Sequence, residues 1–440
     1  MNYEEAMEYI RGTAVFGTKL GLDNIRILMS LLGDPQEKLK CIHIAGTNGK
    51  GSVAAYMLSV MENAGLKVGF YTSPELSRFS ERIRINEEEI SDGDVAKYAT
   101  SVRRMAEYMT DRNLGTPSEF ELVLAMAFCY FLDRGVDAVI LETGLGGRLD
   151  ATNVIGSSIL SVITKISYDH MQYLGDTLMQ IASEKAAIIK KRGKVIVYPA
   201  KDEIMNVFIR RCREQEAELY IAELPTSRRL LKGKTFPGCS GQEFVLQGDN
   251  YLTKMAGIYE TDNASLAIQA VKLLRHTSEM KEYSISDDDI YEGIRKAFWP
   301  GRFEILSDDP VIIADGAHNE DGAAALASTL REYMGGKKIT LCIGILRDKQ
   351  YDRMLAKLLP LADRAIVCEV PNPRSLGAKE LADVIRKADK SVQVIISNTP
   401  WEAFDIIKSL QHEAAAFVIC GSLYLVGPLR EHIHRISSSL

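Results

Sequence analysis

The fold class is decided by one short stretch, Cys41-Ile42-His43-Ile44-Ala45-Gly46-Thr47-Asn48-Gly49-Lys50-Gly51-Ser52. It begins with an apolar run, which predicts a buried strand, and continues through a turn that holds three glycines. A strand, a glycine-rich turn and a helix in this order are typical of a parallel sheet with crossover helices. From about Ser52 onward, apolar residues recur at the spacing of one helix face: Val53, Tyr56, Met57, Val60 and Met61.

The turn itself has the composition of a phosphate-binding loop. Glycines let backbone N–H groups approach a phosphate, and the following helix start adds partial positive charge. In this interpretation Lys50 reaches phosphate oxygens and Ser52 binds Mg²⁺. The common G-x-x-x-x-G-K-[ST] pattern is not met, because Ile44 stands six residues before Lys50 and Gly51 separates Lys50 from Ser52. An ordinary glycine-rich strand–helix turn is the alternative.

Outward from this turn, strands and helices continue to alternate. We predict strands over 67–71, 137–141, 159–166 and 194–198, and a helix over 178–190. Residues 220–255 hold prolines, glycines and short alternating runs, which predict a small antiparallel or irregular section. Trp299-Pro300-Gly301-Arg302 indicates a domain boundary, because Pro-Gly breaks both helices and strands. After it the alternation restarts, with a helical pattern between each pair of strands predicted over 311–314, 339–343, 365–369, 392–396 and 417–420.

The fold class that follows is α/β with two domains. We predict an N-terminal domain over residues 1–298 with a P-loop NTPase-like parallel sheet, and a smaller, Rossmann-like C-terminal α/β domain over residues 299–440.

Composition narrows the classes of function. The 440 residues carry 53 basic and 59 acidic side chains, a net charge of −6, which disfavours binding to nucleic acid or to an acidic membrane. The sequence has no apolar run of membrane-spanning length, and residues 1–17 lack the features of a targeting signal. The seven cysteines are scattered, as free thiols in a reducing compartment are. We therefore expect a cytoplasmic protein.

Polar side chains follow several predicted strands at the point where each strand ends. Ser52 follows the first strand, and Ser73, Glu142 and His170 follow three others. Ligands of open α/β sheets bind beyond the carboxyl ends of the strands, so these four side chains are expected on one side of the predicted sheet, where the Glu142 carboxylate suits a Mg²⁺ ligand. Taken alone, Glu142 also fits a loop carboxylate, and His170 also fits a hydrogen-bonded loop histidine.

Two further segments carry candidate functional side chains. Lys185 falls on the apolar stripe of a predicted helix, where a buried ammonium is costly; a surface lysine with a buried stem is the alternative. Asp315 and His318 follow the predicted strand over 311–314, and Arg302 lies thirteen residues before Asp315. Together they fit a nucleotide site between the domains, whereas a capping aspartate and a local ion pair are the alternative.

Several motifs occur in one order along nearly the whole chain: Thr47 to Ser52, Thr72-Ser73-Pro74, Glu81-Arg82-Ile83, Glu142 with the run Gly144 to Asn153 (GLGGRLDATN), Trp299 to Arg302, Asp315-Gly316-Ala317-His318-Asn319, and Gly421 to Gly427. With these motifs the chain resembles the folylpolyglutamate synthases and their bifunctional dihydrofolate synthase relatives, within the Mur ligase superfamily. The run from Gly144 to Asn153 and the ordered set are specific to this family, whereas the phosphate loop alone indicates only the superfamily.

The resemblance implies an ATP-dependent amide ligase that joins L-glutamate to the carboxylate of (tetrahydro)folate through an acyl phosphate. A dihydrofolate synthase, or a bifunctional enzyme that joins glutamate to dihydropteroate, is the alternative. The resemblance also implies ATP and Mg²⁺ as cofactors and only small molecules as partners, and we expect a monomer.

The residue roles that the resemblance implies fall into four groups. The catalytic residues are Lys50, Lys185, Arg302 and His318, with Lys185 matching the carbamylated lysine of the family. The ATP-binding residues are Asn48, Gly49, Lys50, Gly51, Ser52, Asn263, Arg302 and Asp315. The Mg²⁺ ligands are Ser52, Ser73, Glu142 and His170. Folate or pteroate contacts Ser118, Glu119, Phe120, Glu121, Asp150, Ala151 and Thr152, and the incoming glutamate lies near His318 and Ser422.

The chain departs from the family pattern at a few positions. The family often has His at Glu75, a His-Gln pair at Tyr259-Glu260, Thr and an aromatic residue at Ser118-Glu119, Gly at Ala187, and Asp-Lys-Asp at Asp348-Lys349-Gln350. None of these positions belongs to the phosphate or metal set. Glu75 and Ser118-Glu119 leave the choice of substrate open.

Two functions other than a folate ligase are the alternatives. A ligase for cell-wall precursors belongs to the same superfamily, and the folate-type motifs argue against it. A non-catalytic nucleotide-binding module is a different class of protein, disfavoured by the intact Lys50, Glu142, His170 and Arg302.

Overall fold

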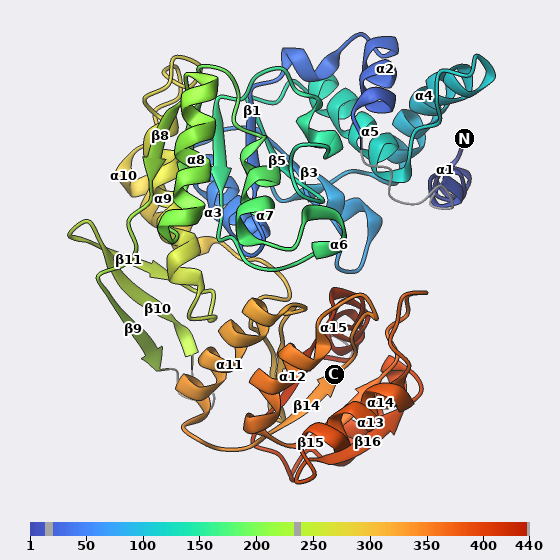
Figure 1. The fold of residues 1–440 in the computed structure, drawn as a ribbon, viewed down its shortest axis with the longest axis vertical. Coiled ribbons are helices and arrows are strands. Elements are labelled where there is room, and N and C mark those ends of the chain that lie inside the picture. Colours follow the sequence, from blue (N-terminus) through green and yellow to red (C-terminus); the bar gives the residue numbers. More distant parts are fainter. Residues whose placement is uncertain (14–20, 233–238, 438–440) are drawn as a thin grey trace. The chain divides into compact units, whose positions relative to one another are not determined.

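The computed structural model describes residues 1–13, 21–232 and 239–437. The chain divides into two compact units. The first comprises Met1–Ile166, Met171–Leu224 and Ala264–Ile294, and the second comprises Ser167–His170, Pro225–Asn263 and Arg295–Leu440. Each unit draws on several stretches of chain, which can be followed by colour in Figure 1. The division into domains at residue 298 stays a prediction.

Among the described residues, the first unit is built on a sheet with strand order β4-β3-β2-β5-β1-β6-β7-β8. β1 lies between β5 and β6, parallel to both, and all of its residues are buried. The strands from β2 to β8 in this order are parallel, whereas β3 and β4 add an antiparallel edge. The strands are β1 (Cys41–Ala45), β2 (Val68–Tyr71), β3 (Ile83–Ile85), β4 (Glu88–Glu89), β5 (Ala138–Glu142), β6 (Leu160–Ile163), β7 (Lys194–Val197) and β8 (Glu218–Ile221).

Helices connect and flank these strands. They are α1 (Tyr3–Gly12), α2 (Asp23–Leu31), α3 (Lys50–Asn63), α4 (Asp92–Asp111), α5 (Glu119–Arg134), α6 (Met171–Leu174), α7 (Leu178–Ala186), α8 (Asp202–Gln215) and α10 (Asp287–Lys296). The chain passes from the second unit back to the first along α9 (Glu260–Leu274).

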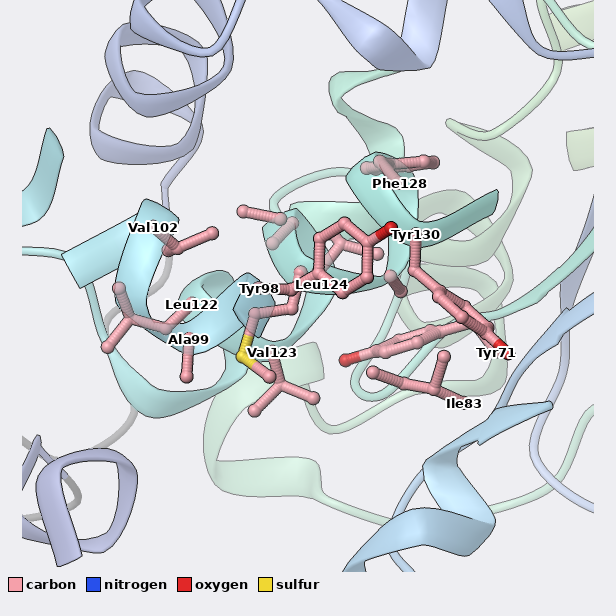
Figure 2. Packing of buried hydrophobic residues seen from close by; sticks show 14 of the residues in the cluster. Tyr71, Ile83, Tyr98, Ala99, Val102, Leu122, Val123, Leu124, Phe128 and Tyr130 are labelled. Atoms are coloured by element: carbon pink, nitrogen blue, oxygen red, sulfur yellow. The ribbon is translucent and has the colours of Figure 1, made fainter. Parts of the chain in front are cut away.

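A buried apolar cluster joins α1, α2, α4 and α5 to the strands β2 and β5. Figure 2 shows part of it, including Tyr98 of α4 and Tyr130 of α5, whose ring centroids lie 5.5 Å apart in an edge-to-face arrangement. Such aromatic pairs add to the stabilisation that burial alone provides. α5 is well delimited, because Ser118 and Glu121 form a capping box at its start and Gly135, with a φ of +60°, ends it.

The predicted strands of this unit are present, with some ends shifted. β1 has the predicted bounds, whereas the strand predicted over 159–166 ends at Ile163. The helix after the phosphate loop begins at Lys50 rather than near Ser52. The helix predicted over 178–190 ends at Ala186, because the chain then tightens into a turn in which Ile189 N–H donates to the Ala186 carbonyl at 3.0 Å.

In its described part, the second unit contains a sheet with strand order β12-β13-β17-β14-β15-β16. β12 is antiparallel to β13, and the other neighbours are parallel. The strands are β12 (Glu304–Asp308), β13 (Val311–Ala314), β14 (Ile339–Ile343), β15 (Ala362–Cys368), β16 (Gln393–Ser397) and β17 (Phe417–Cys420). The helices are α11 (Glu320–Met334), α12 (Tyr351–Leu358), α13 (Ala378–Ala388), α14 (Pro400–Ser409) and α15 (Leu423–Ser437).

This topology matters for the site, because β17 returns to lie between β13 and β14. The loops that follow β13 and β17 therefore meet. Asp315 N–H donates to the Ile419 carbonyl at 2.9 Å, and Gly421 N–H donates to the Ala317 carbonyl at 3.0 Å. The strands predicted after residue 310 are all present, whereas β12 was not predicted.

A small antiparallel sheet in the order β11-β10-β9 also belongs to the second unit, built from β9 (Ser227–Lys232), β10 (Cys239–Leu246) and β11 (Asp249–Thr253). It confirms the antiparallel section predicted within residues 220–255. The predicted α/β class is confirmed as well. Over the described ranges, the helices are too short or too polar for any of them to cross a membrane.

Candidate active site

Two glycines shape the phosphate loop after β1. Gly46 has a φ of +157°, and a Cβ added to it would lie 1.7 Å from Thr164 Oγ1. Gly49 has a φ of +89° at the start of α3, a conformation that favours glycine. Thr164 Oγ1 also donates to the Asn48 carbonyl at 2.8 Å, and Thr47 N–H donates to a backbone carbonyl after β6 at 2.9 Å. The loop is therefore fixed against the segment that follows β6.

Two lysine side chains converge on the carbonyl oxygen of Gly46. Lys50 Nζ donates to it at 3.2 Å and to the Thr47 carbonyl at 3.4 Å. Lys185 Nζ, from α7, donates to it at 2.8 Å, and Lys185 is only 4% exposed. The apolar position of Lys185 is thus a buried one. A Cβ on Gly147 would lie 2.6 Å from a carbonyl oxygen of α7, so the loop after β5 packs directly on the α7 backbone.

The ends of β2 and β5 bring oxygen-bearing side chains together. Glu142, the last residue of β5, is 6% exposed, and Thr72, which follows β2, donates its hydroxyl hydrogen to the Glu142 carboxylate. Ser73 Oγ lies 3.4 Å from the position of a Cβ added to Gly144, so Ser73 stands against the loop after β5. Ser52 is buried in the first turn of α3, which follows β1, the neighbour of β5. Three of the predicted Mg²⁺ ligands thus lie on adjacent elements of the first unit.

The predicted folate-binding segment after β5 is also buried. Asp150 is 5% exposed, and its carboxylate accepts hydrogen bonds from Leu145 N–H at 2.7 Å and Thr152 N–H at 3.0 Å. Burial raises the pKa of Asp150, and these hydrogen bonds oppose the rise. Ala151, between them in sequence, is 6% exposed. The segment is held by its own hydrogen bonds.

The other predicted folate-binding residues lie at the start of α5. Ser118 donates to the Glu121 carboxylate from its hydroxyl at 2.8 Å and from its backbone N–H at 2.7 Å. Phe120 packs edge-on against Tyr71, with ring centroids 5.8 Å apart. Ser118 and Glu121 thus serve the helix terminus, and their contact with substrate stays a prediction.

In the second unit, Asp315 follows β13 and is 3% exposed. Its carboxylate accepts hydrogen bonds from the Tyr259 hydroxyl at 2.7 Å and from two backbone N–H groups at 3.0 and 2.8 Å. Burial raises the pKa of Asp315, and these bonds oppose the rise. A Cβ on Gly316 would lie 2.1 Å from Arg302 Nη1, so the guanidinium of Arg302 lies across the backbone next to Asp315.

A buried carboxylate that the sequence did not reveal, Asp169, lies at the centre of an ionic cluster in the second unit. Its Oδ1 is 2.7 Å from Lys349 Nζ, and its Oδ2 is 3.4 Å from His318 Nε2 and 3.8 Å from His170 Nε2. Asn319 Nδ2 donates to the same Oδ2 at 3.1 Å. Burial alone would raise the pKa of Asp169, but His318 and Lys349 together lower it well below its ordinary value.

The remaining predicted residues of the second unit, Ser422 and Asn263, are both buried. Ser422 follows β17, is 2% exposed and accepts a hydrogen bond from Tyr424 N–H at 3.2 Å. Asn263 is 9% exposed, and its Nδ2 donates to Glu260 at 3.0 Å. Because β17 pairs with β13, Ser422 and Asp315 follow neighbouring strand ends. The place of His170 with Ser52, Ser73 and Glu142 stays a prediction.

Two domain families match the chain: the Mur ligase middle domain over residues 44–271 and the Mur ligase glutamate ligase domain over residues 301–423. A dihydrofolate synthase/folylpolyglutamate synthase of Bacillus subtilis is 35% identical, over 98% of this chain and 99% of that protein. The chain belongs to the folylpolyglutamate synthase and dihydrofolate synthase family of Mur ligases.

Solved structures agree with this family membership. The folylpolyglutamate synthase of Thermotoga maritima is 36% identical with a TM-score of 0.81, covering 98% of this chain and 96% of that one. The folylpolyglutamate synthase of Mycobacterium tuberculosis, complexed with ADP and AMPPCP, is 29% identical with a TM-score of 0.86, covering 98% and 99%. The predicted family, its fold and the class of enzyme, an ATP-dependent amide-forming ligase, are confirmed.

Two departures from the folylpolyglutamate synthase pattern surround one buried cation. Arg82, whose side chain is 6% exposed, pairs with Glu119 at 2.8 Å and lies 3.8 Å from Glu75. Burial alone would lower the pKa of Arg82, but Tyr71 and these two carboxylates raise it above its ordinary value. Glu75 and Glu119 are thus coupled through Arg82, which sequence spacing did not reveal.

Sequence reasoning also missed Tyr259, Asp169 and Lys349. Tyr259 and Lys349 stood out only as positions where the family pattern changes or is incomplete. Asp169 directly precedes His170 in a polar segment, which is the one signal that could have found it.

Proposed function

We propose that this protein is an ATP-dependent ligase that joins L-glutamate to the carboxylate of a (tetrahydro)folate. The observation that carries the proposal is the set of groups in the first unit: a glycine phosphate loop with Lys50, a buried Glu142 beside Thr72 and Ser73, and a buried Lys185 of α7 that donates to the same loop. Its relatives of similar length, named folylpolyglutamate synthases, support the choice of substrates.

The proposed reaction has two steps. The folate carboxylate attacks the γ-phosphorus of ATP, so that a phosphorus–oxygen bond to ADP breaks and an acyl phosphate forms. The neutral amine of glutamate then attacks the acyl carbon, phosphate leaves with the former carboxylate oxygen, and the nitrogen loses a proton as the amide forms. Phosphoryl transfer of this kind needs positioning and charge neutralisation more than covalent help from side chains.

In the first unit, the backbone N–H groups of the loop and Lys50 bind the triphosphate. Hydroxyl and carboxylate oxygens suit Mg²⁺, and Ser52, Ser73 and Glu142 supply them from adjacent elements, so the residues present fit this ion. His170 completes the proposed set. When bound, Mg²⁺ supplies neutralisation of phosphate charge. Glu142 is held for this role, because the Thr72 hydroxyl donates to its carboxylate.

Lys185 is proposed to be carbamylated. Its amine would add to carbon dioxide and lose a proton, which turns a buried cation into an anion. The support is its burial, since a charged ammonium is costly in an apolar position, and its hydrogen bond to the Gly46 carbonyl of the loop that would hold phosphate. A carbamate there would place a negative charge beside the phosphate loop, where it could attract the proposed Mg²⁺.

In the second unit, Asn263, Arg302 and Asp315 are proposed to bind ATP, and His318 and Ser422 to bind the incoming glutamate. The Asp315 carboxylate is fixed by three hydrogen bonds, so it can accept from a ligand hydroxyl without first reorganising. His318 Nδ1 faces the Gly316 carbonyl at 2.8 Å, which requires that Nδ1 carry the hydrogen. Its Nε2 lies 3.4 Å from Asp169 Oδ2, so contacts at both ring nitrogens orient the imidazole in the proposed glutamate site.

A second acceptor is supported by a specific observation. The Bacillus subtilis relative, of which the chain covers 99%, is named for both dihydrofolate synthase and folylpolyglutamate synthase. Dihydropteroate is therefore the alternative acceptor, and the same groups would join glutamate to its carboxylate.

The test is release of phosphate from ATP by the purified chain with L-glutamate and either tetrahydrofolate or dihydropteroate. We expect turnover only when acceptor, glutamate, ATP and Mg²⁺ are all present. Lys50→Ala should abolish it, whereas Lys67→Ala, at an exposed lysine of the same unit, should leave it unchanged. If neither tetrahydrofolate nor dihydropteroate supports turnover, the proposal is contradicted.

A further inference from the structure

His43 is a buried histidine on β1 to which neither the phosphate loop nor the metal set assigns a role. It is 0% exposed and stands three residues before Gly46. Its Nε2 lies 2.8 Å from Thr152 Oγ1, across 109 positions of sequence. Its other ring nitrogen, Nδ1, is buried and has no hydrogen-bond partner among the described residues.

The direction of the hydrogen bonds follows from the chemistry of the groups. Thr152 Oγ1 donates its hydroxyl hydrogen to Asp150 Oδ1 at 2.5 Å, so toward His43 it can only accept. Burial lowers the pKa of His43 well below its ordinary value, so the ring is neutral and carries one N–H. That hydrogen belongs on Nε2, because an N–H on the partnerless Nδ1 would be buried unsatisfied.

Asp150, which accepts the Thr152 hydrogen bond, also holds the loop after β5. Its second oxygen, Oδ2, accepts from Leu145 N–H at 2.7 Å. The neighbouring Gly144 is packed so closely that an added Cβ would lie 2.9 Å from the Phe120 ring and 3.4 Å from Ser73 Oγ. The chain His43–Thr152–Asp150–Leu145 thus connects the strand that leads into the phosphate loop with the loop that borders the proposed acceptor pocket.

We propose that His43 is a positioning residue for the folate or pteroate acceptor: its Nε2–H fixes the Thr152 hydroxyl, which fixes Asp150 and the loop after β5. This inference rests on the proposed function, because it assigns the segment from Asp150 to Thr152 to the acceptor. His43 does not touch the reacting atoms, and its effect on the acceptor is exerted through Thr152.

Steady-state kinetics of three variants test the relay. Thr152→Val removes the hydroxyl and keeps the shape, His43→Leu removes the donor, and His43→Gln keeps an N–H that can reach Thr152. We expect the first two to raise KM for the acceptor about tenfold, as loss of a buried hydrogen bond does, and to leave KM for ATP within about twofold. His43→Gln should retain most of the wild-type KM. The double variant His43→Leu/Thr152→Val should be no worse than Thr152→Val alone, because Thr152→Val already removes the hydrogen bond that His43 makes.

Thr340→Val is the matched control. Thr340 is a buried threonine of β14 in the second unit whose hydroxyl has no hydrogen-bond partner among the described residues, so the same change there should leave both KM values unaltered. An acceptor KM that stays at the wild-type value in Thr152→Val, or that rises together with the KM for ATP, overturns the positioning role. Multiplying effects in the double variant overturn the relay.

One measurement separates this inference from the proposed function. The ring-nitrogen shifts of protein labelled with ¹⁵N-histidine report the tautomer of His43 without any turnover, and the resonances are assigned by their loss in His43→Gln. An Nε2–H tautomer supports the relay, and an Nδ1–H tautomer refutes it even if the enzyme is a ligase. Absence of acceptor-dependent turnover in the wild type, by contrast, refutes the proposed function whatever the tautomer.

Discussion

The ion pair between Asp169 and Lys349 gives the sharpest prediction about stability. The two side chains are only 8% and 7% exposed, and the oxygen–nitrogen distance is 2.7 Å. Asp169→Asn keeps the shape of the side chain and removes its charge. Lys349 is then left buried without its carboxylate, and His318 loses the negative charge beside its Nε2.

The expected magnitude follows from the burial of the pair. Removing one partner of a buried ion pair typically costs about 3–5 kcal/mol of unfolding free energy, because the remaining charge is not compensated. The matched control is Glu380→Gln in the same unit, where Arg347 and Glu380 pair at 2.9 Å with side chains 59% and 48% exposed. Exposed pairs contribute about 0–1 kcal/mol, so the control should cost far less.

The assay can report on the second unit alone. The chain has two tryptophans, Trp299 and Trp401, and both lie in that unit. Tryptophan fluorescence during urea unfolding therefore follows its loss of structure, with the slope m compared between variants to confirm that the same transition is measured. Equal losses of unfolding free energy in Asp169→Asn and Glu380→Gln would show that the buried pair contributes no more than the exposed one. Adding Lys349→Met to Asp169→Asn should recover stability, because no buried charge is then left alone.

Three other predictions address the first unit. Gly46→Ala should abolish ATP binding in calorimetry, because its Cβ would lie 1.7 Å from Thr164 Oγ1, and normal affinity would contradict the loop geometry. Lys185→Ala should lose most turnover, and a small carboxylate or bicarbonate should restore part of it if the carbamate is the reason; full activity would end that role. Burial lowers the pKa of His43 in the folded state, so the unfolded chain binds the proton more readily. The contribution of the neutral ring to the free energy of unfolding is therefore complete above the ordinary histidine pKa of about 6.5. Below that pH it falls by about 1.4 kcal/mol per pH unit until the folded-state pKa is reached. Thermal unfolding of His43→Gln should lack this part of the slope, and identical slopes would show that His43 is not buried neutral.

Sequence alone located those parts of the fold and site that depend on local pattern. The strand Cys41–Ala45 and its glycine turn were found because apolar runs and glycines are local signals. The apolar residues around Lys185 left a buried lysine and a surface lysine both open, and the structure shows that the side chain is buried. β12 was missed, since Glu304–Asp308 is short, partly polar and bulged where it pairs with β13.

Contacts between residues far apart in sequence produce no local pattern from which they could be predicted. Asp169 and Lys349 are 180 residues apart, and Tyr259 and Asp315 are 56 apart, so no spacing rule relates them. Arg82 shows the same limit, because Glu75 and Glu119 were each noticed separately and only the fold reveals that they share one cation. Side chains that are distant in sequence can be paired only when the order of the strands is known.

Product analysis decides whether this chain is a glutamate ligase for folate-type acceptors. The purified protein is incubated with ATP, Mg²⁺, isotopically labelled L-glutamate and tetrahydrofolate or dihydropteroate, and the products are separated by mass. We expect an acceptor lengthened by one labelled glutamate, with one ADP and one phosphate formed for each amide. ATP hydrolysis without label in either acceptor would contradict this expectation.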